Sequence, residues 1–212
     1  MGKHLDKLLS IAGDALGPKV SRLPEVILEQ AGILAAELEG LLTQKNGFYG
    51  FESALHVFPC DPGSAEYDLV QWNSKELWRN QYGEYTEGML FFAEEIFAEQ
   101  FSIKDGRIYR FHLETGESKE IAPNFEAWAK LLLDIYNLET GFSVAHEWQV
   151  RNGPITVGHR LSPTQPFVLG GGYNIDNFWA ADTRTILLFN ASLASQIRDL
   201  PDGTQVQIKI VD

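Results

Sequence analysis

The stretch that decides the fold runs from Met89 to Ile121 and reads MLFFAEEIFAEQFSIKDGRIYRFHLETGESKEI. Short apolar or alternating runs are separated here by turn residues, as in successive antiparallel strands. Asp105-Gly106 has the composition of a two-residue hairpin turn, and Glu114-Thr115-Gly116 forms the next turn. The stretch therefore predicts a meander with strands at Met89–Ala93, Phe101–Ile103, Arg107–Leu113 and Lys119–Ile121.

The third of these strands and the segment after the meander predict how the sheet is covered. Tyr109, Phe111 and Leu113 alternate with Arg110 and His112, so we expect one face of this strand to be core and the other wet. Asn124 is expected to cap a helix whose apolar residues, from Phe125 to Leu138, are spaced to pack on the sheet.

The residues before the meander predict helices first and then shorter elements. Apolar positions at helical spacing indicate a helix over Leu5–Leu16 and a longer one from Pro24 to Asn46, with Gly32 and Gly40 as possible interruptions. Further along, we expect a strand at Leu55–Phe58, a second strand at Leu69–Trp72 and a short helix or irregular segment at Leu77–Tyr85.

The composition changes after Gly141, where Asn152-Gly153-Pro154 and Gly170-Gly171-Gly172 indicate turns. We therefore expect an α+β domain over residues 1–140, with a central antiparallel sheet flanked by helices. A smaller mixed segment, residues 141–212, is expected to pack on it as a C-terminal extension. Its predicted elements are a strand at Phe178–Ala181, a helix at Thr185–Asp199 and a strand at Thr204–Val211.

Composition limits the classes of function that the chain can have. The formal net charge is −12, from 17 basic and 29 acidic residues, so direct binding of nucleic acid or of an anionic membrane is disfavoured. No apolar run approaches the roughly 20 residues that span a bilayer, so we expect no membrane insertion. The single cysteine, Cys60, excludes an intrachain disulfide and suits the reducing cytosol. The acidic charge would favour a basic protein partner, although it could equally serve solubility.

No motif for catalysis, a metal or a cofactor is present. Cys60 has no assignable catalytic partner, and a buried or loop thiol is the simpler interpretation. The glycine run at 170–172 lacks the spacing of a phosphate-binding loop and is expected to be a flexible turn. The five histidines lack metal-ligand spacing and are expected to be structural or surface residues: His4, His56, His112, His146 and His159.

Glutamates follow the first strand of the meander at positions 94, 95 and 99. A solvated face is one interpretation of Glu94, Glu95 and Glu99, because glutamate is a surface residue by default. Catalytic use of paired carboxylates would require a pocket and shifted pKa values. An acidic docking patch is the preferred functional alternative.

Aromatic and turn residues recur in several segments of the chain: Asn46–Pro59, Trp72-Asn73, Phe91–Glu95, Gln100-Phe101, Glu114–Glu117 and Trp128-Ala129, and later Trp148-Gln149, Asn152-Gly153, Arg160-Leu161, Pro166–Gly171 and Leu200–Gly203. The earlier segments resemble the SUKH superfamily, the Smi/Knr-like group, and the later ones resemble the C-terminal extension that some members carry. The resemblance implies an α+β fold with a central sheet flanked by helices. Many members are immunity proteins that bind and neutralise a cognate toxin, often a nuclease, and no family catalytic residue can be carried over.

The leading hypothesis is a non-catalytic, cytosolic protein-binding module that neutralises a toxin by occluding it, with Asp68, Glu84, Glu94, Glu95 and Glu99 as candidate contacts. One alternative is a general regulatory or interaction protein. Another is a small-ligand-binding protein or an enzyme, with a pocket between the meander and the C-terminal segment.

Overall fold

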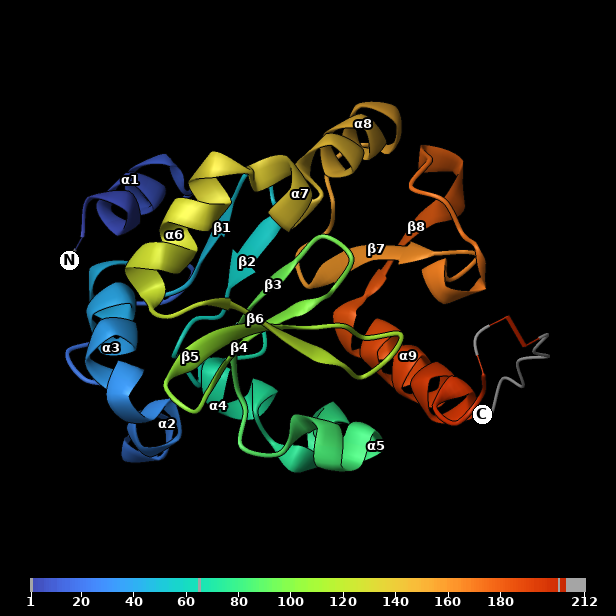
Figure 1. The fold of residues 1–212 in the computed structure, drawn as a ribbon. Helices are drawn as coiled ribbons and strands as arrows, with labels where there is room; N and C mark the ends of the chain where they lie inside the picture. Colours follow the sequence, from blue (N-terminus) through green and yellow to red (C-terminus); the bar gives the residue numbers. More distant parts are fainter. Residues whose placement is uncertain (1, 65, 202, 205–212) are drawn as a thin grey trace.

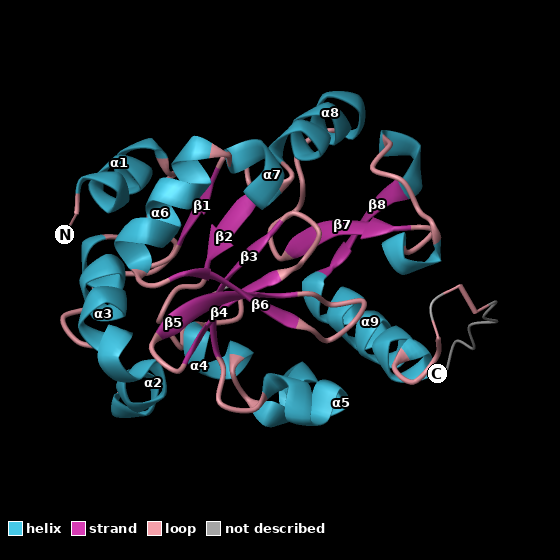
Figure 2. Ribbon diagram, in the orientation of Figure 1, coloured by secondary structure: helices cyan, strands magenta, loops and turns pink. Residues whose placement is uncertain are grey.

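A six-stranded antiparallel sheet, whose strands are ordered as they occur in the chain, organises the structure (Figures 1 and 2). The structure is a computed structural model that describes residues 2–64, 66–201, 203 and 204. Helices surround this sheet, and a separate two-stranded sheet lies toward the C-terminus. The predicted α+β class is therefore confirmed.

The predicted meander forms the larger part of the sheet. Asp105 and Gly106 both have positive φ (50° and 73°), as a tight hairpin turn requires, and Lys104 pairs with Arg107 across it. Two short strands that precede the meander extend the sheet on the side of its first strand. The strands are β1 (Phe48–Gly50), β2 (Leu55–Val57), β3 (Leu90–Glu95), β4 (Gln100–Lys104), β5 (Arg107–Phe111) and β6 (Ser118–Ala122).

The N-terminal helices are shorter than predicted. The first, α1 (Lys3–Ile11), ends before Leu16, and the long helix expected after Pro24 is divided at Gly32, which has φ +56°. The divided parts are α2 (Glu25–Ala31), the 3-10 turn η1 (Gly32–Leu34) and α3 (Ala35–Gln44).

The segment from Leu69 to Trp72 is a helix, α4, and the predicted strand is wrong. The Asp68 side chain caps it by accepting a hydrogen bond from the Gln71 N–H at 2.7 Å. Three short helical pieces follow where a short helix or irregular segment was expected: the π-helix η2 (Lys75–Arg79), α5 (Asn80–Tyr82) and η3 (Gly83–Thr86).

Helices lie over both faces of the sheet, so the face of the third strand of the meander that was predicted to be wet is only partly exposed. Phe111 of β5 packs against Trp78 and Tyr82, whereas Arg110 stacks over Phe101 on the opposite face. All six residues of β3 are buried. The alternation of apolar and polar residues correctly predicted that they lie on opposite faces of the sheet. Helices from distant parts of the chain, however, partly cover the polar face.

Helix α6 (Phe125–Asp134) covers one face and lies beside α1 (Figure 1). The Asn124 side chain accepts a hydrogen bond from the Ala127 N–H at 2.9 Å, which confirms the predicted cap. The helix ends at Asp134 because Ile135 leaves the helical region (φ −136°, ψ 40°). The expected continuation is a separate helix, α7 (Tyr136–Thr140), and α8 (Phe142–Asn152) follows where turns were expected to begin.

The C-terminal segment pairs β7 (His159–Pro163) with β8 (Phe178–Asp182) and ends in α9 (Thr183–Ile197). The strand and helix predicted near 178 and 185 are thereby confirmed, and the predicted strand at 204–211 falls outside the described residues. Ile186, Leu187 and Ala191 of α9 belong to the main hydrophobic core. A smaller core contains Ala54, Ile96, Ala145, Ile155, Leu161 and Phe178.

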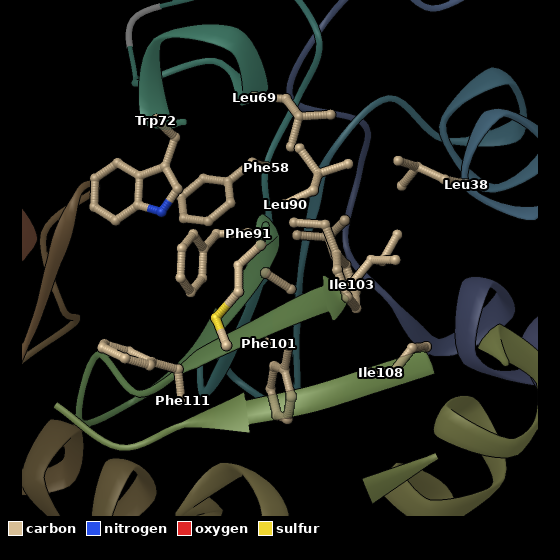
Figure 3. Close-up of a cluster of buried hydrophobic side chains, with 14 of the residues drawn as sticks. Leu38, Phe58, Leu69, Trp72, Leu90, Phe91, Phe101, Ile103, Ile108 and Phe111 are labelled. Carbon is tan, nitrogen blue, oxygen red and sulfur yellow. The ribbon is translucent and has the colours of Figure 1, made fainter. Parts of the chain in front are cut away.

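The main core extends from the sheet into the helices. Figure 3 shows part of it, where Phe58 and Trp72 gather beside Phe91. Phe58 and Trp72 have ring centroids 4.7 Å apart, and Trp72 and Trp78 are 5.8 Å apart. Trp72, Trp78 and Tyr82 are therefore buried core, whereas Tyr85 is half-buried.

Candidate functional site

The five carboxylates proposed as partner contacts do not form one exposed patch. Asp68, Glu94 and Glu95 are 1%, 1% and 2% exposed. Asp68 is used as the cap of α4, and Glu94 lies 2.9 Å from the Arg160 guanidinium. Glu84 is exposed and pairs with Arg198, whereas Glu99 is partly exposed. The expectation of a shared acidic surface is corrected, because the fold buries three of its members.

Two of these residues, Glu95 and Glu99, instead border a cleft of about 580 Å³ at one end of the sheet. The β3–β4 turn, the β5–β6 turn, the α7–α8 junction and the loop at residues 167–173 form its walls. Its lining is Glu95, Phe97, Glu99, Arg110, His112, Glu114, Thr115, Glu117, Asn137, Leu138, Gly141, Ser143, Val144, Phe167, Val168 and Tyr173.

Glu95 closes the turn between β3 and β4. Its Oε1 accepts hydrogen bonds from the backbone N–H groups of Phe97 at 2.8 Å and Glu99 at 3.0 Å. Burial, opposed by the nearby Arg110 charge, raises the pKa of Glu95 to about 8. At neutral pH this carboxyl group is therefore mostly protonated, and a cation placed beside it would favour loss of the proton.

Glu99 pairs with His112. Its Oε2 lies 2.6 Å from the histidine Nδ1, and the hydrogen bond to Glu99 raises the pKa of His112 against the opposing effect of burial. Both side chains are partly exposed to solvent, at 21% and 39%. This pair therefore remains within reach of a molecule that enters the cleft.

Glu114 connects the meander to the C-terminal segment. Its two carboxylate oxygens accept the backbone N–H groups of Phe167 at 2.9 Å and Val168 at 2.7 Å. Burial raises its pKa, although these hydrogen bonds oppose the shift. Glu114 thus has a clear structural role, because it fixes the loop that forms one wall of the cleft.

Aromatic rings form the apolar part of the cleft. Phe167 and Tyr173 stack with ring centroids 4.3 Å apart, and Phe97 meets them edge-on at 5.8 and 5.6 Å. The faces of such rings attract cations, and the surrounding carboxylates add to this attraction. The cleft therefore has the chemistry of a site for an ammonium or guanidinium group.

The positive charge of Arg110 is held by a carboxylate outside the cleft. Its Nη2 lies 2.9 Å from the Glu139 carboxylate, and its guanidinium carbon is 5.1 Å from the centre of the Phe101 ring. The guanidinium group is thus already paired with one carboxylate outside the cleft lining. Glu99, which pairs with His112, and Glu117 also line the cleft.

Sequence reasoning identified Glu95 and Glu99 but missed Glu114, Glu117 and the rings of Phe97, Phe167 and Tyr173. These residues come from separate segments, and no spacing in the sequence joins them. The hairpin turn predicted at residues 114–116 could have placed Glu114 near the β3–β4 turn, because alternate turns of a meander lie at the same end of the sheet.

Cys60 and the possible metal ligands provide no further candidate site in the described part of the chain. Cys60 is buried, as expected, and burial raises its pKa to about 11, so it is a poor nucleophile. Among residues 2–64, 66–201, 203 and 204, no group of three His, Cys, Asp or Glu side chains is arranged to hold a metal ion. Within the same residues, no helix is both long and apolar enough to cross a bilayer.

Comparison with protein-family models and with curated proteins finds no match. Among solved structures, the chain is similar to Atu4351 from Agrobacterium tumefaciens. The TM-score is 0.55 at 12% sequence identity, over 90% of this chain and 88% of that chain. Similarity at this level shows a shared fold alone. The resemblance to the SUKH superfamily stays a prediction.

Proposed function

We propose that the chain is a non-catalytic protein-binding module of the cytosolic immunity type, which binds a basic toxin domain and occludes it. The acidic cleft supports this proposal, together with the net charge of −12 and the resemblance to the SUKH superfamily. The net charge would speed the encounter with a basic partner, and the cleft would hold one of its side chains.

The observation that carries the proposal is the combination of carboxylates and aromatic rings in one cleft. A lysine or arginine side chain of the partner could pair with Glu99 or Glu117 while its stem packs on Tyr173. Aromatic residues and paired charges of this kind are frequent anchors at protein interfaces. Glutamates outnumber basic side chains in the lining of the cleft, which disfavours an anion as its ligand.

A small cationic ligand is the second candidate, because the cleft volume of about 580 Å³ lies within the usual range of small-molecule sites. The two functions differ in what they require around the cleft. A protein partner would also cover the exposed rim, whereas a small ligand would not. Affinity for a protein should therefore respond to rim charges as well as to the cleft.

The test is an affinity pull-down from the native cell lysate with three forms of the tagged protein. The cleft variant carries Glu99→Gln and Glu117→Gln, and the matched control carries Glu29→Gln and Glu87→Gln at exposed positions. We expect the wild type and the control to recover the same basic protein, and the cleft variant to recover at least about tenfold less. Recovery should also fall as salt rises.

The recovered protein is then expressed alone and together with this chain. Growth arrest by the protein alone, relieved by the wild type but not by the cleft variant, supports the immunity function. A harmless partner would contradict immunity and favour the regulatory alternative. Equal recovery by the cleft variant would contradict the cleft as the contact site.

A further inference from the structure

A second cavity, of about 380 Å³, lies on the other side of β3 from the acidic cleft. Its lining includes His56 of β2, Glu94 of β3, Glu66 of the loop before α4, and Asp182 and Thr183 at the start of α9. Phe58 and Trp72 supply aromatic surface. The cavity is thus bounded by both the sheet and the C-terminal segment, and the function proposed above does not use it.

His56 lines this cavity and lies between two glutamates. Its Nδ1 is 3.2 Å from Glu94 Oε1, and its Nε2 is 3.4 Å from Glu66 Oε2. The imidazole side chain is only 3% exposed, and within the described part of the chain Nε2 has no hydrogen-bond partner. A buried polar nitrogen without a partner is rare in native proteins and requires a cause.

The neighbours of Glu94 decide which imidazole nitrogen carries the proton. Glu94 accepts a hydrogen bond from Gln100 Nε2 at 3.1 Å and pairs with Arg160 at 2.9 Å. Burial would raise its pKa, but Arg160 and His56 together keep the pKa below its ordinary value. The carboxylate is therefore ionised and can only accept, so Nδ1 must donate to it.

The second nitrogen of His56 is then a hydrogen-bond acceptor. Burial lowers the pKa of His56, which favours the neutral ring with a lone pair on Nε2. Glu66 Oε2, 3.4 Å from this nitrogen, already accepts a hydrogen bond from the Tyr49 hydroxyl at 2.5 Å. Two acceptors thus face each other, and a donor supplied by a molecule in the cavity would satisfy both.

We propose that this cavity binds a small organic amine, whose primary ammonium group donates hydrogen bonds to His56 Nε2 and to the Glu66 carboxylate. Asp182 adds a second negative charge to the lining, and the rings of Phe58 and Trp72 suit a short alkyl stem. Arg160 pairs with Glu94 and does not line the cavity.

The test uses n-butylamine, which is an ammonium ion at neutral pH, as the probe and the full chain as the protein. Two comparison compounds separate the contributions: 1-butanol keeps the stem without the charge, and tetramethylammonium keeps the charge without an N–H donor. Binding is measured by calorimetry and by the nitrogen chemical shifts of the His56 imidazole. We expect butylamine to bind at least about tenfold more tightly than either comparison compound, the effect of a charge-assisted hydrogen bond.

Two variants locate the site. Glu66→Gln removes the charge but keeps an oxygen for Tyr49, and it should weaken butylamine binding at least about tenfold. Glu52→Gln is the matched control, because Glu52 also pairs with a histidine, His146, but lies exposed outside the cavity. The control should bind butylamine as the wild type does, with the same shift at His56 Nε2.

Three results would overturn the proposal. Protonation of both His56 nitrogens in the free protein at pH 7 would mean that an imidazolium bridges Glu94 and Glu66 and leaves no open acceptor. Equal affinity for 1-butanol would show that charge plays no part. Unchanged butylamine binding by the folded Glu66→Gln variant would place the amine elsewhere.

Discussion

Glu94 and Glu95 are neighbours on β3, yet their carboxylates line two different cavities. Successive side chains of a strand point to opposite faces of the sheet, so Glu94 faces His56 and Arg160 while Glu95 faces the acidic cleft. Both are buried, but their pKa values shift in opposite directions. Arg160 stabilises the charge of Glu94, whereas burial outweighs the Arg110 charge near Glu95.

Glu95 should make the protein less stable as pH rises. Its folded pKa of about 8 exceeds the ordinary value of 4.5, so the folded protein retains a proton that the unfolded chain loses within this range. The stabilisation is fully present below about pH 4.5 and is lost as pH rises through 8. Each pH unit within the range should cost at most about 1.4 kcal/mol of unfolding free energy.

The variant Glu95→Gln tests this dependence, because glutamine keeps an oxygen for the N–H groups of Phe97 and Glu99. Urea denaturation from pH 5 to 9 should show the variant gaining stability relative to the wild type as pH rises. Glu114, whose pKa is also raised, is present in both proteins and cancels. Glu120→Gln, at an exposed position, should follow the wild type, and parallel curves for Glu95→Gln and wild type would refute the prediction.

Glu94 and Arg160 form a buried ion pair that joins the main sheet to the C-terminal segment. Glu94→Ala leaves the guanidinium group buried without its partner and should reduce the unfolding free energy by about 3–5 kcal/mol. The double variant Glu94→Leu with Arg160→Met removes both charges and should recover most of that loss. A double variant as unstable as Glu94→Ala in urea denaturation would show that the charge itself is not the cause.

Asn73 attaches α4 to the sheet. Its Nδ2 donates to the carbonyl oxygens of Leu69 and Phe91, both at 2.8 Å, and its Oδ1 accepts the Phe91 N–H at 2.8 Å. Asn73→Ala leaves these buried groups unsatisfied, and we expect a loss of about 2–4 kcal/mol in chemical denaturation. Asn80→Ala, at an exposed position nearby, should cost less than about 1 kcal/mol. Similar losses for the two variants would contradict this role of Asn73.

Gly47 and Gly88 have nearly equal positive φ, 69° and 71°, but different surroundings. A Cβ at Gly47 would lie 2.6 Å from the backbone nitrogen of Pro59, whereas one at Gly88 would meet nothing within 4 Å. Gly88→Ala should cost about 1–2 kcal/mol from backbone conformation alone, and Gly47→Ala about 1–3 kcal/mol more from crowding. The difference in thermal unfolding midpoint between the two variants measures the effect of crowding at Gly47. Equal midpoints would show that crowding has no effect.

Local patterns were sufficient where neighbouring residues determine the conformation. Asp105-Gly106 predicted its hairpin turn because few residues adopt positive φ readily, and Asn124 predicted the start of α6 because its side chain can cap a helix. The same reasoning failed at Leu69–Trp72. An apolar run of this length fits a strand or a helix, and the Asp68 cap with the Asn73 contacts to β3 decided in favour of the helix.

The sequence by itself determined the α+β class, the meander and the acidic charge, because these follow from residue type and from periodicities of a few residues. Only the tertiary structure decided which carboxylates are buried. Glu94, Glu95 and Glu99 form one acidic group in the sequence. In the structure, successive side chains of β3 point to opposite faces of the sheet, which separates Glu94 from Glu95. The partners of these carboxylates, among them His56, Arg160, His112 and Tyr173, come from segments that the folded backbone alone brings together.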